Sequence, residues 1–258
     1  GRSSFGHRFS HPGRLRLESA GDYRAALERA GVMVDPRQRK ASIEAGIAEL
    51  AHRCGGRILP DDELLETVNY LVEYPAPVLG TFDTEFLELP REILITAMRE
   101  HQKYFAVVDE ADRLLPAFAA VNNTPVRNPE LVAAGHGRVL RARLKDAQFF
   151  YQSDLHETRD RWNAKLEGVL FQARLGTMHD KVDRVGRLAE GLAEAAALTA
   201  EEKRSVSRAA QICKADLVSQ VVVEFPKLQG VMGRIYALAA GEPPAVATSV
   251  EEHYRPTH

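Results

Sequence analysis

The sequence predicts an α+β protein in which a mixed α/β part is followed by an all-α part. Two runs rich in β-branched and aromatic residues, 103–108 and 114–121, both lie in the first half of the chain. From about Asn128 onward, apolar residues recur at helical spacing almost throughout. We therefore expect a mixed α/β domain over residues 1–155 and an all-α domain, truncated at its C-terminus, over residues 156–258.

The first predicted elements are a strand and a helix. Residues 14–18 alternate between charged and apolar side chains, which is typical of a half-buried strand. Asp35 followed by Pro36 predicts a helix start, because aspartate caps helices well and proline is favoured at the first helical position. The pair Gly55-Gly56 predicts where this helix ends.

Two more helices and a hairpin complete the predicted α/β part. Acidic residues from Asp61 onward favour the positive end of a second helix, which Pro75 ends. Residues 78–89 are expected to be irregular, and Pro90 starts a third helix. The two β-type runs are joined by residues 109–113, a suitable length for a hairpin turn.

Composition describes a soluble globular chain. The 258 residues are 45% hydrophobic and 27% charged, which is too apolar for a disordered chain, and no stretch is long and apolar enough for a membrane helix. Cys54 and Cys213 are too few for a disulfide framework, so a reducing, cytoplasmic compartment is expected. The first residues lack an initiator methionine and signal-peptide features, which suggests the middle of a longer protein.

The formal net charge of −2 conceals an uneven distribution. Residues 51–133 hold 7 basic and 14 acidic side chains, a net of −7, whereas residues 134–188 hold 11 and 7, a net of +4. Local charge governs encounter with phosphates, so a basic middle segment keeps nucleic-acid binding open.

The basic segment contains a predicted amphipathic helix. Arg138, Arg141 and Lys145 fall on one helical face and Arg143 lies off it. The apolar stripe of the same helix is formed by Val139, Leu140, Leu144, Ala147 and Phe150 or Tyr151. These four basic residues are candidates for RNA-phosphate contacts, and the alternative is a solvated face whose partners are Asp146 and Asp154.

A second group of polar residues lies at the predicted junction of helix and strand. His101, Gln102, Lys103 and Tyr104 crowd together there, and such junctions are common ligand sites. The alternative is ordinary loop chemistry. The chain has no phosphate-binding loop, nucleophile elbow or zinc-protease motif, so no catalytic residue is assigned.

A third group comprises His179, Asp180 and Asp216. Thr177 and Asp180 form a predicted capping box, which places His179 in the first turn of a helix, and Asp216 is expected in the middle of a later helix. Histidine and aspartate on two helices could hold a metal, and the alternative is a helix cap and a buried polar pair.

Several stretches, taken together and in order, resemble the β subunit of bacterial glycyl-tRNA synthetase. They are GHRF (6–9), RKASIEAGI (39–47), LLETVNYLVEYPAPVLGTFD (64–83), FLELPREILITAMREHQKYFAV (86–107), VLRARLKDAQFFY (139–151), LGTMHDKVDR (175–184), CKADLV (213–218) and EFPKLQGVMGRIYA (224–237). The match covers nearly the whole chain.

This resemblance implies an α₂β₂ glycine–tRNA ligase with a division of labour between its subunits. The α subunit uses ATP and Mg to attach glycine to its tRNA, and the β subunit binds and positions that tRNA, so no cofactor is expected in this chain. The first half would be similar to the editing-type domain of the phenylalanyl-tRNA synthetase β subunit. The second would be a degenerate HD-like domain, in which Ala215 stands where an active HD enzyme has histidine.

Two other functions stay open at the level of the sequence. One is a metal-dependent HD-type phosphohydrolase that uses His179, Asp180 and Asp216, although its metal set would lack a histidine. The other is a purely structural scaffold that joins the α subunit to distal RNA-binding parts of the protein.

Overall fold

The computed structural model describes residues 2–255, which form two compact units that divide between Leu144 and Lys145. Helix α5 (Pro129–Leu155) runs through the boundary between these units. The boundary expected from the sequence, at residues 155/156, falls at the end of the same helix. The mixed α/β character is confirmed, and helices predominate over small antiparallel sheets.

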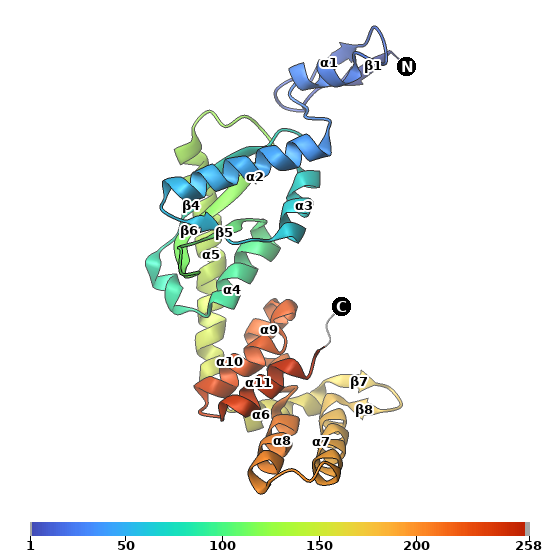
Figure 1. Cartoon of the computed structure of the whole chain (residues 1–258), viewed down its shortest axis with the longest axis vertical. Helices are drawn as coiled ribbons and strands as arrows, with labels where there is room; N and C mark the ends of the chain where they lie inside the picture. The colour runs from blue at the N-terminus through green and yellow to red at the C-terminus, as the bar shows by residue number, and fades with distance from the viewer. Residues whose placement is uncertain (1, 256–258) are drawn as a thin grey trace. The chain divides into compact units, whose positions relative to one another are not determined.

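The first unit is built on a four-stranded antiparallel sheet in the order β3–β5–β6–β4 (Figure 1). Its strands are β3 (Arg57–Ile58), β4 (Ala76–Thr81), β5 (Phe105–Val108) and β6 (Leu114–Asn122). The predicted hairpin between β5 and β6 is confirmed, because the Asp109 N–H donates to the Arg113 carbonyl at 2.9 Å. Strands β5 and β6 are largely buried, as their β-branched and aromatic sequences indicate.

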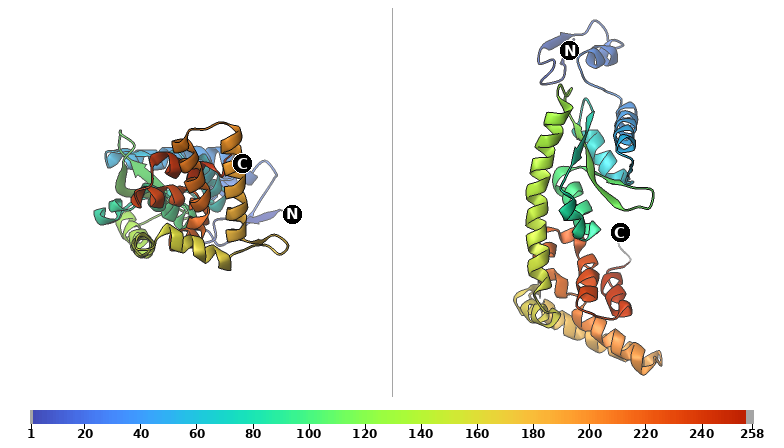
Figure 2. Two further views of the ribbon diagram at one scale, coloured as in Figure 1. Left: turned by 90° about the horizontal axis from the view of Figure 1, so that it is seen from below. Right: turned by 90° about the vertical axis from the view of Figure 1, so that its left-hand side faces the viewer.

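Helices cover both faces of this sheet. Figures 1 and 2 show α2 (Pro36–Arg53) on one side and the first part of α5 on the other. The predicted start of α2 is confirmed, because the Asp35 carboxylate accepts from the Arg37 N–H at 2.9 Å. The core between α2, α3 (Asp62–Leu71) and the sheet includes Ile43, Ile47, Leu64, Leu65, Val68, Phe105 and Ala119.

The third predicted helix is short and changes from α-helical to π-helical geometry. Helix α4 (Arg91–Thr96) continues into one π-helical turn, Ala97–Gln102. This turn ends at Lys103, whose φ of 57° lies in the left-handed region. Met98 of this turn is buried, so packing against the core stabilises the π-helical geometry.

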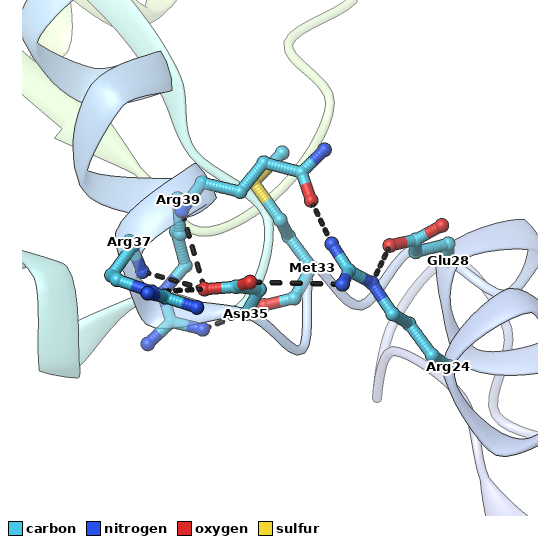
Figure 3. Close-up of polar contacts among 7 residues, drawn as sticks. Arg24, Glu28, Met33, Asp35, Arg37 and Arg39 are labelled. Carbon is cyan, nitrogen blue, oxygen red and sulfur yellow. Dashed lines mark hydrogen bonds and ion pairs between the residues drawn. The ribbon is translucent and has the colours of Figure 1, made fainter.

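A small N-terminal segment precedes α2 and was only partly predicted. It contains the hairpin β1 (Ser3–Phe5) and β2 (Arg14–Arg16) and the unpredicted helix α1 (Tyr23–Arg29). Figure 3 shows its polar attachment to α2: Arg24 lies 3.6 Å from the Asp35 carboxylate, and Arg39 donates to the Met33 carbonyl at 2.6 Å. Arg39 also donates to the Asn69 carbonyl at 2.8 Å, which ties the segment to α3.

Buried His7 gives this segment a second anchor. Its Nδ1 accepts from the backbone N–H groups of Phe9 and Ser10, both at 3.3 Å. Because Nδ1 is an acceptor, the proton resides on Nε2, which donates to the Asn123 carbonyl. The Asn123 side chain in turn accepts from the Tyr74 N–H at 3.1 Å. Asn123, which follows β6, therefore contacts both the N-terminal segment and the residues before β4.

The prediction that residues 78–89 are irregular is wrong at its start. Strand β4 occupies Ala76–Thr81 and pairs with β6 along its length, and a 3-10 turn follows at Thr84–Glu88. Pro77 and Gly80 weaken the strand signal in the sequence. Both residues fit because proline is tolerated on an edge strand and Gly80 lies directly under the Phe118 ring.

The second unit is a helical assembly with one small hairpin. Its helices are α6 (Arg159–Lys165), α7 (Met178–Ala195), α8 (Ala200–Ile212), α9 (Gln220–Glu224), α10 (Val231–Ala239) and α11 (Pro244–Glu252). The hairpin of β7 (Leu170–Gln172) and β8 (Gly176–Thr177) corrects the prediction of an all-α second half. Both strands are too short for a periodic signal, and β8 begins at Gly176, whose φ of 85° is a conformation that favours glycine.

Aromatic and acidic side chains meet in the core of this unit. Trp162 is buried and packs edge-on against Tyr236, with ring centroids 5.0 Å apart. Buried Asp154, from the last turn of α5, accepts from the Tyr236 hydroxyl at 2.7 Å and from the Gln220 and Val221 N–H groups at 2.9 and 3.0 Å. Asp154 therefore caps α9 rather than pairing with the basic residues of its own helix.

No helix in the described part of the chain combines the length and the apolar character needed to cross a membrane.

Candidate functional site

The predicted basic helix exists and exposes its basic side chains. Arg138, Arg141 and Arg143 are exposed on α5, whereas Leu140 and Leu144 are fully buried. Lys145, also exposed, is the first residue of the second unit. The prediction that Val139 belongs to the buried stripe is wrong, because 48% of its surface is exposed.

The arginines of α5 differ in how much of their charge is neutralised. The Arg141 guanidinium donates to the Asp83 carboxylate, just after β4, at 2.6 Å. Arg138 and Arg143 form no ion pair with any residue that the structure describes. Asp146, which the solvated-face interpretation named as a partner, is exposed on the same helix and no ion pair joins it to them. The charges of Arg138 and Arg143, which lie on different faces of α5, therefore have no acidic partner among the described residues.

Arg138 and Arg141 also line a hollow of about 480 Å³ between α5 and β4. Leu79, Gly80 and Thr81 form its strand side, and Ala133, Ala134 and Gly137 form its helix side. Helix and strand lie close together because Gly137 has no side chain: a Cβ there would lie 3.0 Å from the Thr81 carbonyl oxygen. The charged residues that line the hollow are Arg138, Arg141 and Glu130.

One residue of the predicted polar junction takes part in a half-buried network. The Tyr104 hydroxyl lies 2.7 Å from Nδ1 of His136, and Nε2 of His136 lies 3.0 Å from Oδ1 of Asn122. Because Oδ1 can only accept, Nε2 carries the proton and Nδ1 accepts from Tyr104. The ring of Tyr104 stacks on Phe118 with centroids 4.6 Å apart.

Burial keeps this network uncharged. It raises the pKa of Tyr104 to about 12 and lowers the pKa of His136 below its ordinary value. His136 and Asn122 were not among the predicted site residues, although Asn122 ends a strand and His136 stands between two glycines in a helix. The network joins α5 to the sheet, and His101, Gln102 and Lys103 are not part of it.

Asp180 forms the predicted capping box. Its carboxylate accepts from the Thr177 N–H at 2.7 Å, and the Thr177 hydroxyl lies 3.2 Å from the Asp180 N–H. These hydrogen bonds lower the pKa of Asp180. His179 lies in the same first turn, and its Nδ1 is 3.9 Å from the Asp183 carboxylate. The confirmed capping box therefore accounts for Asp180 without a metal.

Asp216 lies in a 3-10 turn, Ala215–Val218, and the prediction that it sits mid-helix is wrong because α8 ends at Ile212. The buried carboxylate accepts from the N–H groups of Gly230 and Gly233 at 2.6 and 3.1 Å. Burial raises its pKa to about 6 despite these hydrogen bonds. Asp216 therefore connects its turn to the start of α10.

Lys214 and two residues of the C-terminal part surround the same turn. The Lys214 ammonium lies 3.5 Å from the centre of the Tyr254 ring, and burial lowers the pKa of Lys214 to about 8. Burial likewise lowers the pKa of His253 to about 4. Within the described residues, no three His, Cys, Asp or Glu side chains come together in a metal-binding cluster. His179, Asp180 and Asp216 thus have separate protein partners.

Comparison with known proteins decides the family. The family model described as glycyl-tRNA synthetase β subunit matches residues 1–258. The chain belongs to the glycyl-tRNA synthetase β subunit family. The sequence stretches that resemble this family include His7 and Asp216, and both residues are buried. Part of the similarity to the family therefore lies in residues that stabilise the fold.

Named relatives of this β-subunit chain are similar over its whole length. The glycine–tRNA ligase β subunit of Desulforapulum autotrophicum is 52% identical over 254 residues, which are 98% of this chain and 37% of the relative. The proteins of the same name from Synechocystis sp. and Geobacter sulfurreducens are 49% and 47% identical, each over all of this chain and 36% and 37% of the relative. The chain therefore spans a little over a third of the relatives it matches.

Proposed function

We propose that this chain is the part of a glycine–tRNA ligase β subunit that binds and positions glycine tRNA, while the α subunit attaches glycine to it. Family membership over the whole chain and the names of the relatives support the reaction class. The observation that carries the RNA-binding role is the set of exposed basic side chains along α5, of which Arg138 and Arg143 have no acidic partner among the described residues.

The proposal includes the assembly and the division of labour. The chain works in a cytoplasmic α₂β₂ enzyme in which ATP and Mg are used by the α subunit, so this chain supplies no catalytic residue. Residues 1–155 act as an editing-like RNA-proximal domain without editing chemistry. Residues 156–258 act as a degenerate HD-like scaffold, a role supported by the helix-capping and turn-holding contacts of Asp180 and Asp216.

The salt dependence of binding distinguishes phosphate contacts from other contacts. Each phosphate that a lysine or arginine neutralises contributes about 0.7–0.9 to the slope of log affinity against log salt. Arg138, Arg143 and Lys145 are exposed and lie at most seven residues apart on α5. Loss of all three contacts should therefore reduce the slope by about 2 to 3.

The experiment titrates glycine tRNA into the 258-residue chain at several salt concentrations. The variant Arg138→Gln, Arg143→Gln, Lys145→Gln removes three charges without creating new repulsion. A separate Arg141→Gln variant tests the arginine whose charge Asp83 already neutralises, and its effect should be smaller.

A matched control removes three charges elsewhere. The variant Arg16→Gln, Arg29→Gln, Arg91→Gln changes exposed arginines of β2, α1 and α4 and should leave the slope nearly unchanged. Equal slopes for the parent and the α5 variant would refute the RNA contact. Failure of the parent to bind tRNA, with stable binding to the α subunit, would favour the scaffold. Stoichiometric manganese with phosphodiester turnover would favour the HD-type phosphohydrolase.

A further inference from the structure

Strand β4 is the last strand of its sheet, and one of its edges faces away from β6. The strand pairs with β6 from Ala76 to Thr81, and the next ladder bond is donated by the Phe82 N–H to the Pro116 carbonyl at 3.1 Å. Backbone groups of an antiparallel strand alternate between its two edges. Since Phe82 faces β6, the backbone groups of Leu79 and Pro77 face outward.

Pro77 confirms this assignment on chemical grounds. Proline has no N–H, so at an inward position it would break the ladder to β6, whereas at an outward position it removes a donor that has no neighbour. The outer edge of β4 therefore presents the Leu79 N–H and the carbonyl groups of Pro77 and Leu79. Such a row of donors and acceptors is a template for another strand.

The open edge forms the floor of a groove between helices. A hollow of about 750 Å³ is bounded by Leu50 and Arg53 at the end of α2, by Pro77–Leu79, and by Arg127–Glu130 at the start of α5. The hollow of about 480 Å³ described above continues along Leu79–Thr81. Both hollows are lined by residues of the first unit alone. The groove is thus long enough for a short extended segment.

The groove is positively charged and partly apolar. Arg53 and Arg127 are exposed, and neither forms an ion pair with a residue in the described chain. Glu130 is the acidic residue that lines the same hollow. Leu50, Pro77 and Leu79 add apolar surface between the charges. An occupant that alternates acidic and apolar side chains would complement both features.

We propose that the outer edge of β4 is a docking site for an extended acidic segment of a partner protein, which adds as a short fifth strand. A polypeptide backbone supplies both the acceptor that the Leu79 N–H requires and the donors that the two carbonyl groups require. The phosphates of a single-stranded nucleic acid fit this edge less well than a polypeptide backbone, because they only accept hydrogen bonds and cannot pair with the two carbonyl oxygens. Because the acidic side chains of such a strand all point to one face, they contact the arginine that lies on that face, either Arg53 or Arg127.

The added strand is short, because both ends of the edge are restricted. Pro77 contributes no N–H at one end. At the other end, α5 passes so close that a Cβ on Gly137 would lie 3.0 Å from the Thr81 carbonyl oxygen. The pairing therefore centres on Leu79, and the side chains of the added segment determine much of its affinity.

This proposal is independent of the RNA contact proposed above. Arg53 and Arg127 line the hollow of about 750 Å³. Arg138 and Arg141 line the hollow of about 480 Å³ along Leu79–Thr81. Variants at Arg53 and Arg127 therefore leave the proposed RNA-binding residues unchanged, and the failure of one proposal does not imply the failure of the other.

The test uses the 258-residue chain and a short fluorescent peptide of alternating valine and glutamate. Binding is followed by fluorescence anisotropy, and hydrogen exchange is measured on the chain with and without peptide. The peptide should bind and should protect the Leu79 amide from exchange. A peptide with the same side chains but N-methylated at the residues that would donate to β4 should bind about tenfold more weakly.

Charge variants test whether the groove prefers an acidic peptide. Arg53→Glu, Arg127→Glu should weaken binding of the valine–glutamate peptide by about tenfold and should favour a valine–lysine peptide. The matched control Arg29→Glu, Arg91→Glu makes the same charge change at exposed positions away from the groove and should bind like the parent.

Several outcomes would overturn the proposal. Equal binding of the N-methylated peptide, or an unprotected Leu79 amide in the complex, would show that no strand is added. Binding of a uridine oligonucleotide in place of the peptide, lost in the Arg53/Arg127 variant, would assign the groove to RNA. Concentration-dependent dimerisation that protects Leu79 without any peptide would assign the edge to a second copy of the chain.

Discussion

The buried carboxyl group of Asp216 makes a quantitative prediction about stability and pH. Its pKa is raised from 3.8 to about 6 because burial disfavours the charged form more than the Gly230 and Gly233 N–H groups favour it. At about pH 2 the carboxyl group is protonated in both the folded and the unfolded chain. Between pH 4 and 6 the unfolded chain ionises first, so the folded state loses stability as pH rises.

The magnitude follows from the size of the shift. A shift of about two pKa units at 1.36 kcal/mol per unit corresponds to about 3 kcal/mol lost above pH 6. Asp216→Asn cannot ionise and keeps an oxygen that can accept from Gly230. Its amide NH₂ takes the place of Oδ1, which has no hydrogen-bond partner, at a pH-independent cost of about 1–2 kcal/mol. Because the unfolded carboxyl group is already partly ionised at pH 4, the free energy of unfolding of the variant minus that of the parent should rise by about 2–2.5 kcal/mol between pH 4 and 7.

The assay is urea unfolding followed by tryptophan fluorescence. Trp162 is the single tryptophan of the chain, is buried, and lies in the same unit as Asp216. Taking the difference between variant and parent cancels the titration of groups that do not interact with Asp216. Asp180→Asn serves as the opposite control, because the Thr177 hydrogen bonds lower the pKa of Asp180 below 3.8, so the corresponding difference should fall as pH rises toward 4 and stay level above it. A flat or falling difference for Asp216→Asn would refute the reasoning.

Two further predictions concern packing. Asp154→Ala leaves three donors in the second unit without their acceptor and should lower the free energy of unfolding by about 3 kcal/mol in the fluorescence assay. Asp146→Ala, an exposed change on the same helix, should alter it by less than about 0.5 kcal/mol, and an equal loss in both variants would contradict the capping role. Gly80→Ala places a Cβ 2.2 Å from the Phe118 ring and should destabilise the first unit by about 1–3 kcal/mol in circular dichroism melts. Gly135→Ala, whose Cβ meets nothing within 4 Å, should stabilise it by about 0.5–1 kcal/mol, and if Gly80→Ala did the same the close packing of β4 on β6 would be wrong.

The helix starts could be predicted because their causes are local. Asp35 caps α2 and Asp61 caps α3 through backbone N–H groups two or three residues away. The capping box of Thr177 and Asp180 spans three residues. The hairpin between β5 and β6 closes over a few residues as well, so its turn was predicted correctly.

Strand β4 could not be predicted because what stabilises it is distant in sequence. Gly80 is a poor strand residue by itself, and only the ring of Phe118 on β6 explains why a glycine is needed there. Pro77 is compatible with a strand only at the edge of a sheet, and the sequence does not reveal the order of the strands. The short hairpin of β7 and β8 was overlooked for a similar reason, since its strands have too few residues for a period.

The candidate RNA-binding residues were found by helical periodicity, which correctly indicates that Arg138, Arg141 and Arg143 are exposed. Periodicity could not show that Asp83 neutralises Arg141, because the two residues are 58 positions apart. For the same reason it could not show that Asp216 accepts from Gly230 rather than facing His179.

The sequence alone determined the family, the positions of most helices and the presence of a basic segment in a nearly neutral chain. These properties depend on residue identity and on neighbours within about one helical turn. Only the tertiary structure decided which charges are paired, which carboxyl groups are buried and which strand edge is open. Burial and pairing depend on residues that folding brings together from distant positions, so the free arginines of α5 and the open edge of β4 could be recognised only in the folded chain.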